Sequence, residues 1–334
     1  MHVIWEDRLP GLLYHDASLA NSAMSHEKII NIDALRINTM IQHFTVVDEH
    51  THTYPTEVAA KVLAPFAAYH ELDPIQLGNG TIEEVVSAMH RDGIDYTVLA
   101  NFAPAHIVHR NNCWTLAMAQ QHPQLIPLVS LHPDMEGDLL GHFLHYLALG
   151  AKGLKIHPSI QEFHPNDPKM QEVYAYCDAH AIPVVFHCGF VSRVYLNDYA
   201  DLAMMLPVID AYRHLPIVLT HMAEGNADDV FRIAEQYPHV RFDTSIAISG
   251  KLCFKRLHDL CWQDDAFVVA VIRRVGAERF VFGSDYPFGS PIHDVTRFLR
   301  MPLTDDEKRL IVGGNALELF GMSETGIDEA CGAG

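Results

Sequence analysis

The chain has 334 residues, a hydrophobic content of 49% and a formal net charge of −19 at neutral pH. This length accommodates one barrel of roughly 250 residues with extensions, and the apolar fraction is ample for a large core. The negative charge argues against nucleic acid as a partner, because phosphate binding requires a concentrated basic surface.

Residues 1–42 precede the first strong strand pattern and are interpreted as an N-terminal extension with one helix around 25–40. The first residues lack the basic start and apolar stretch of a signal peptide, and no run approaches the roughly 18 apolar residues of a membrane span. The six cysteines show no C-x-x-C spacing, as is typical of reduced thiols. We therefore expect a cytoplasmic protein without a membrane partner.

From residue 43 onward, apolar runs rich in branched side chains alternate with amphipathic segments. The expected strands are 44–49, 94–100, 125–131, 152–157, 182–187, 216–221, 239–245 and 279–284. The expected helices include 81–91, 112–121, 169–180, 227–236 and 266–275. Eight alternations favour a closed α/β fold, the (β/α)8 TIM barrel, over residues 43–322, followed by a C-terminal tail at 323–334. The alternative is an open doubly wound sheet, but its first turn would need a glycine-rich phosphate loop that this chain lacks.

The helix expected at 81–91 has signals at both of its ends. Thr81 is a good N-cap residue and is followed three positions later by Glu84. Asp92 and Gly93 are expected to end this helix before the second strand, because glycine readily adopts the left-handed conformation of a C-cap.

Several of the expected strands end in polar residues that bind metals or substrates. These residues are His50 and His52, Lys155 and His157, His187, His221, and Asp285. An H-x-H pair alone is weak evidence, since about one or two are expected by chance in a chain with 23 histidines. The position at strand ends gives the pattern weight, because the carboxyl ends of barrel strands form the active-site face.

Strand periodicity predicts how the first of these motifs is arranged. In a regular strand, His50 and His52 point to one face together with Asp48, whereas Glu49 and Thr51 point to the other. Asp48 could then orient a ligand, and Asp243, near the end of the seventh strand, is a second candidate for that role. Three histidines and one aspartate form a nitrogen and oxygen set suited to Zn²⁺, Mn²⁺ or Fe²⁺ with one position open for water.

The motifs, in their order, resemble the amidohydrolase superfamily, and within it the amidohydrolase 2 group that includes enzymes similar to aminocarboxymuconate-semialdehyde decarboxylase. The resemblance covers about residues 44–320. It rests on Val47-Asp48-Glu49-His50-Thr51-His52 with Pro55, Gly153-Leu154-Lys155-Ile156-His157-Pro158, Val185-Phe186-His187-Cys188-Gly189, Leu219-Thr220-His221-Met222, Gly283-Ser284-Asp285-Tyr286-Pro287, and Gly313-Gly314-Asn315-Ala316-Leu317-Glu318-Leu319-Phe320.

This resemblance implies roles for individual residues. His50, His52 and His187 would be metal ligands. Asp285 would touch the metal and accept a proton from the metal-bound water, and His221 would stand close to that water or to the substrate.

Lys155 has two interpretations. It matches the position where some superfamily members carry a carbamylated lysine between two metals, but a free amine could instead bind a substrate carboxylate. We favour one metal and a free amine. His157 is interpreted either as a substrate contact or as a packing residue. Arg193 follows the fifth strand and is a candidate to pair with a substrate carboxylate, although such an arginine is more often a surface residue.

The sequence thus predicts a metal-dependent hydrolase, with one Zn²⁺ as the expected ion, that cleaves a C–N or C–O bond of a small organic molecule. The alternative is a metal-dependent decarboxylase of a small unsaturated or aromatic acid, and a non-catalytic binding barrel is a third possibility. The insertions at 53–80 and 246–265 are expected to set specificity. A homodimer is compatible with the family resemblance.

Overall fold

The computed structural model describes residues 39–70, 78–189, 197–250 and 261–322. Eight parallel strands pair in the order of the sequence. They are β1 (Val47–Thr51), β2 (Tyr96–Leu99), β3 (Leu125–Val129), β4 (Gly153–Ile156), β5 (Val184–Phe186), β6 (Ile217–Leu219), β7 (Val240–Asp243) and β8 (Phe280–Val281). The barrel architecture predicted from the sequence is confirmed.

The barrel is nearly closed between β8 and β1, where the pairing is sparse. The backbone N–H of Glu49 donates to the carbonyl of Phe282 at 2.8 Å. Beyond this bond, one isolated parallel bridge joins Thr51 to Tyr286. These few backbone contacts make up the seam of the barrel.

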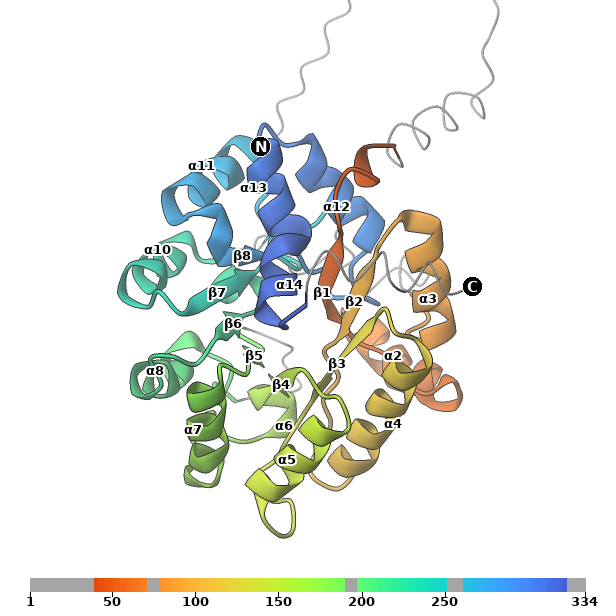
Figure 1. Ribbon diagram of the computed structural model, residues 1–334, viewed down its shortest axis with the longest axis vertical. Helices are drawn as coiled ribbons and strands as arrows, with labels where there is room; N and C mark the ends of the chain where they lie inside the picture. The colour runs from red at the N-terminus through yellow and green to blue at the C-terminus, as the bar shows by residue number, and fades with distance from the viewer. Residues whose placement is uncertain (1–38, 71–77, 190–196, 251–260, 323–334) are drawn as a thin grey trace, which may run out of the picture. The chain divides into compact units, whose positions relative to one another are not determined.

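Helices surround the ring of strands (Figure 1). They are α2 (Thr56–His70), α3 (Ile82–Asp92), α4 (Val108–Gln121), α5 (Leu139–Ala148), α6 (Pro158–Gln161), α7 (Gln171–His180), α8 (Leu202–Ala211), α9 (His221–Gly225), α10 (Ala227–Gln236), α11 (Asp265–Val275), α12 (Pro291–Arg300), α13 (Asp305–Arg309) and α14 (Asn315–Leu319). Three short helical turns complete the described elements: η1 (Pro168–Met170), η3 (Ala277–Arg279) and η4 (Leu310–Gly314).

The predicted caps of α3 are confirmed. The Thr81 side chain accepts a hydrogen bond from the backbone N–H of Glu84 at 3.3 Å. Gly93 is left-handed, with φ of 71°, and its N–H donates to the carbonyl of Met89. These local signals therefore fix the connection that leads into β2.

One apolar cluster at the amino ends of the strands is closed by a helix from late in the sequence. Val47 opens β1 and packs with Val98, Val218 and other strand residues. Ala316, Leu317, Leu319 and Phe320, in and just after α14, complete the same cluster. Figure 1 shows α14 crossing the ring of strands beside β1. The opposite ends of the strands remain available for polar residues.

Several element boundaries differ from the predictions. The first strand is Val47–Thr51 rather than 44–49, and α4 begins at Val108 rather than at 112. Two strands stop before the histidines that were expected to end them, because the chain turns at once into another element. After β4, His157 is the N-cap of α6, and after β6, His221 opens α9.

The expected N-terminal helix at 25–40 lies almost wholly outside the described residues. The domain boundaries at 42 and 322 accordingly stay predictions. Among the described segments, no helix has both the length and the apolar character needed to cross a membrane.

Candidate metal centre

An irregularity in β1 decides which side chains enter the barrel. The pairing of β1 with β2 shifts register between Asp48 and Thr51, as at a β-bulge. The Asp48 carboxylate therefore accepts hydrogen bonds from Thr51 and Ser284. Glu49 instead lies close to His50 and Asp243, and the candidate ligand atoms of these three residues are all within 4.8 Å of one another. The predicted alternation was wrong at this point: Asp48 does not share the face of the histidines, and Glu49 points inward.

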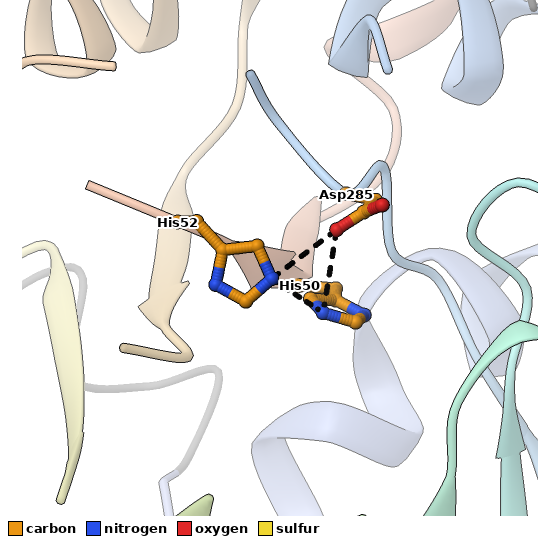
Figure 2. A group of neighbouring side chains, drawn as sticks. All are labelled: His50, His52 and Asp285. Atoms are coloured by element: carbon orange, nitrogen blue, oxygen red, sulfur yellow. Dashed lines mark hydrogen bonds and ion pairs between the residues drawn. The ribbon is translucent and has the colours of Figure 1, made fainter. Parts of the chain in front are cut away.

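His50 from β1, His52 just after it and Asp285 from the loop after β8 converge at the carboxyl ends of the strands (Figure 2). The Nε2 atoms of His50 and His52 are 3.1 Å apart. Asp285 Oδ1 lies 3.2 Å from Nε2 of His52 and 3.5 Å from Nε2 of His50. All three residues are buried.

The chemistry of these donors fits a divalent ion. His50 Nδ1 hydrogen-bonds the Asp243 carboxylate, which can only accept, so Nδ1 carries the proton and Nε2 presents its lone pair to the centre. Ligands about 2.0–2.1 Å from one ion would be separated by roughly 3.0–3.4 Å, close to the separations found here. We conclude that His50, His52 and Asp285 can hold one such ion together.

The ionisation states suit coordination. Burial lowers the pKa of His50 and of His52, which keeps both imidazoles neutral as metal binding requires. Burial alone would favour the neutral acid of Asp285, but His50, His52 and His221 outweigh it and hold the pKa of this carboxyl below its usual value. Asp285 is therefore an anion beside two neutral imidazoles.

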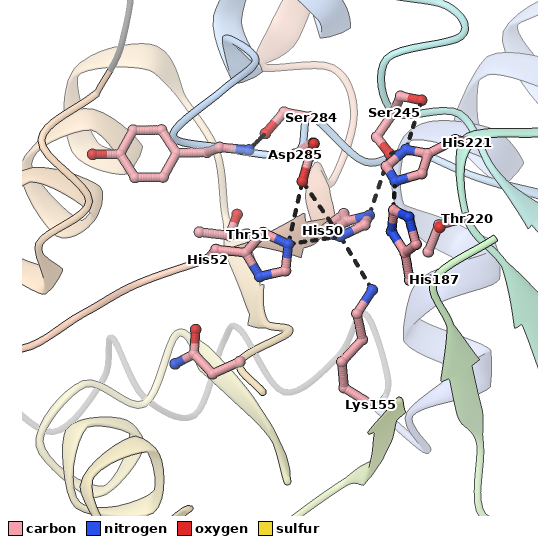
Figure 3. Close-up of polar contacts among 12 residues, drawn as sticks. His50, Thr51, His52, Lys155, His187, Thr220, His221, Ser245, Ser284 and Asp285 are labelled. Carbon is pink, nitrogen blue, oxygen red and sulfur yellow. Dashed lines mark hydrogen bonds and ion pairs between the residues drawn. The ribbon is translucent and has the colours of Figure 1, made fainter. Parts of the chain in front are cut away.

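Lys155 lies in β4, one residue before its end, and reaches the centre of the barrel. Its side chain is fully buried, and Nζ lies 3.2 Å from Nε2 of His50 (Figure 3). Burial lowers the pKa of this amine, while Glu49, Asp243 and Asp285 act in the opposite direction. The predicted catalytic lysine is thus brought directly against the ligand group.

His187 and His221 form a neighbouring pair. His187 Nδ1 lies 3.2 Å from His221 Nε2, and His221 Nδ1 lies 2.9 Å from Ser245 Oγ. The His221 ring stacks on that of His50, with centroids 5.2 Å apart. Within the described chain, no group of three close donors includes His187, so its role as a ligand stays a prediction.

An aromatic wall continues from this pair. The His157 ring stacks on His187 with centroids 3.9 Å apart and an interplanar angle of 7°. Phe102, which follows β2, packs against His157 on one side and against His52 on the other. His157 Nδ1 also accepts a hydrogen bond from the N–H of Ile160, which supports its structural interpretation. Arg193 lies outside the described residues.

The sequence analysis missed several residues of the site. Phe102 carried no signal, since a phenylalanine after a strand is ordinary. Ser284 and Ser245 follow β8 and β7, and only their position at strand ends could have singled them out. Asp243 hydrogen-bonds His50, the contact that its suggested role requires, and the role itself stays a prediction.

Comparison with known proteins gives the family of the chain. The amidohydrolase family model (Amidohydro_2) matches residues 47–322. The chain belongs to the amidohydrolase family. This family is metal-dependent, and the centre described above lies within the matched region. No curated protein matches the chain in sequence.

Solved structures share the fold of this amidohydrolase at low sequence identity. A 5-carboxyvanillate decarboxylase from Sphingomonas paucimobilis has a TM-score of 0.64 at 16% identity, covering 84% of this chain and 100% of its own. A dihydroxybenzoic acid decarboxylase from Polaromonas sp., with bound manganese and an inhibitor, has a TM-score of 0.61 at 17% identity, covering 83% and 97%. A probable 2-pyrone-4,6-dicarboxylic acid hydrolase from Acinetobacter baumannii has a TM-score of 0.56 at 16% identity, covering 84% and 100%.

Proposed function

We propose that this amidohydrolase is a metal-dependent hydrolase that cleaves a C–N or C–O bond of a small organic substrate. The observation that carries the proposal is the position of the Asp285 carboxylate, 3.2 Å from Nε2 of His52 and 3.5 Å from Nε2 of His50. A divalent ion bound there, for which Zn²⁺ is our first choice and Mn²⁺ or Fe²⁺ the alternatives, would polarise the scissile group and acidify water.

The residues of the chain would supply the remaining steps. A carboxylate oxygen of Asp285 would take the proton of the attacking water and later return it to the leaving group. Lys155 Nζ, buried beside the ligands, would donate to an oxygen of the substrate. His221, stacked on His50, would hold the substrate on the side opposite Phe102 and His52.

The charges around Lys155 favour one ion and a free amine. Burial lowers the pKa of Lys155, and the fully buried Glu49 and Asp243 act against this effect and favour the positive charge. A carbamate at this position would instead add a negative charge next to these two carboxylates and Asp285. Intact mass under mild conditions, together with the metal content per chain, tests this point. Two ions in the wild type and fewer in Lys155→Ala would contradict it.

Substrate trials with metal-loaded protein test the hydrolytic proposal. Lactones, amides and unsaturated or aromatic carboxylic acids would be assayed in ¹⁸O-labelled water, and label in the product is expected. Asp285→Asn should lower turnover by at least ~10² with a smaller change in substrate binding. Asp95→Asn, which alters a partly buried carboxylate that bonds only backbone, is the matched control.

Decarboxylation of a small aromatic or unsaturated acid is the second candidate. It is favoured by the aromatic wall of Phe102 and His157 and by the decarboxylases that share the fold. Lys155 would then hold the carboxylate of the substrate. Release of CO2 without ¹⁸O at the reacting carbon would replace the hydrolytic proposal with this one.

A further inference from the structure

Asp48 lies next to the candidate metal centre but faces away from it. Its carboxylate is 1% exposed and accepts four hydrogen bonds. Oδ1 accepts from the backbone N–H groups of His50 at 3.2 Å and Ser284 at 2.9 Å. Oδ2 accepts from Ser284 Oγ at 2.6 Å and Thr51 Oγ1 at 3.2 Å. One side chain thus binds both segments that carry the candidate ligands.

The two bonds from Ser284 cross the seam of the barrel, where strand pairing is weakest. Asp48 and Ser284 are 236 positions apart. Among the described residues, the backbone bonds between their segments are few: Glu49 N–H donates to Phe282, and His52 N–H donates to Tyr286 at the isolated bridge. In a regular ladder, successive backbone bonds would set how far β1 stands from the next segment. At this seam, the Asp48 carboxylate supplies much of that constraint.

The backbone of Asp285 depends on the same bonds. Its φ is 59°, in the left-handed region that a non-glycine residue adopts only when its surroundings hold it there. The preceding Ser284 is bonded to Asp48, and its Oγ accepts from the N–H of Tyr286 at 3.1 Å. The carbonyl of Tyr286 accepts from the N–H of His52 at 2.7 Å. Asp285 is therefore fixed on both sides to β1.

We propose that Asp48 is a positioning residue that sets the separation between the imidazoles of β1 and the carboxylate of Asp285, and thereby the affinity of the centre for a divalent ion. The inference rests on the proposed metal centre. Asp48 contacts neither the ion nor the substrate. It acts through the backbone of His50 and through Ser284.

Asp48→Asn tests the proposal with little change of shape. The two backbone N–H groups at Oδ1 cannot reverse, so the amide oxygen must face them and the NH2 group must replace Oδ2. That NH2 cannot accept the O–H of Ser284, so the hydroxyl that donates to Oδ2 in the wild type loses its acceptor. The bond that holds Ser284 is weakened, and the Asp285 carboxylate moves relative to the two histidines.

The readout is binding of Co²⁺ and Zn²⁺ to the purified full chain, measured by titration, with the visible spectrum of Co²⁺ as a report on ligand geometry. Asp48→Asn should weaken binding about 10–100-fold, the usual cost of losing a partner that orients ligands, and should shift the Co²⁺ bands. Asp95→Asn is the control, because Asp95 accepts from the N–H of Val46 at 2.8 Å, just before β1, and touches no ligand segment. It should leave affinity and spectrum unchanged.

Each outcome separates this inference from the function on which it rests. If the wild type binds neither ion, the proposed metal centre fails. If the wild type binds but Asp48→Asn keeps its affinity and spectrum, the positioning role fails. Equal losses in Asp48→Asn and Asp95→Asn would assign the effect to general destabilisation and would also overturn it. If Asp48→Asn does not fold, Ser284→Ala serves in its place, because it removes the hydroxyl contacts and keeps the bond from the Ser284 N–H to Asp48. It should weaken metal binding by less than the roughly 10–100-fold expected for Asp48→Asn.

Discussion

Replacing Asp243 with asparagine should damage the candidate metal centre without altering any ligand. The Asp243 carboxylate accepts hydrogen bonds from His50 Nδ1 and from the backbone N–H of Ser245. An asparagine has a single acceptor oxygen, so one of these two donors must face an NH2 group. Because the backbone donor cannot change, we expect His50 to move its proton to Nε2 or to rotate. Either response removes the lone pair that faces His52 and Asp285.

The expected loss of metal affinity follows from the single hydrogen bond between Asp243 and His50. Partners that orient a ligating histidine contribute about 10–100-fold to metal affinity, which corresponds to roughly 1.4–2.8 kcal/mol. The loss of Zn²⁺ affinity is measured by competition between Asp243→Asn and a chromophoric chelator at neutral pH. Urea unfolding of the metal-free protein checks that the variant is folded. An unchanged dissociation constant in a folded variant would refute the assignment of the His50 tautomer.

Three further predictions concern stability and can be measured by urea unfolding. Thr304→Ala removes the capping box that Thr304 forms with Glu307 at the start of α13, and should cost about 1 kcal/mol. The backbone N–H of Thr304 holds the pKa of Glu307 below its ordinary value of 4.5. The contribution of Glu307 to the free energy of unfolding is therefore complete above pH 4.5 and is lost as pH falls through the lower pKa of the folded state. Glu307→Gln should flatten the dependence of stability on pH in this range, and an unchanged dependence would contradict the prediction. Gly313→Ala would place a Cβ 2.0 Å from the carbonyl oxygen of Thr45, and should destabilise the barrel by about 1–3 kcal/mol.

Local patterns predicted the barrel and most of its chemical residues. The branched runs marked the strands, and the polar residues just beyond them marked the face at which His50, His52 and Asp285 meet. This works because the side chains that follow parallel strands must share one end of a barrel, whatever the helices between them do. Lys155 was placed at the centre by the same argument.

The remaining features depend on contacts that no local pattern encodes. The shifted register of β1 turns Glu49 inward and Asp48 outward, and strict alternation predicts the reverse. The bonds from Asp48 to Ser284 join residues at opposite ends of the barrel sequence. Phe102 gains its place only because β2 lies beside β1. Such features appear when the strands are assembled, since each requires two distant segments at once.

The closing of the apolar cluster by α14 has a consequence for how the protein is made. Val47 is synthesised early, whereas Leu317 and Phe320, which cover the same cluster, are synthesised only after all eight strands. Until then, the amino ends of the strands expose apolar surface that can bind other nascent chains. Completion of this fold therefore waits until α14 has been synthesised, and a chaperone that shields the growing barrel would act mainly on this end of it.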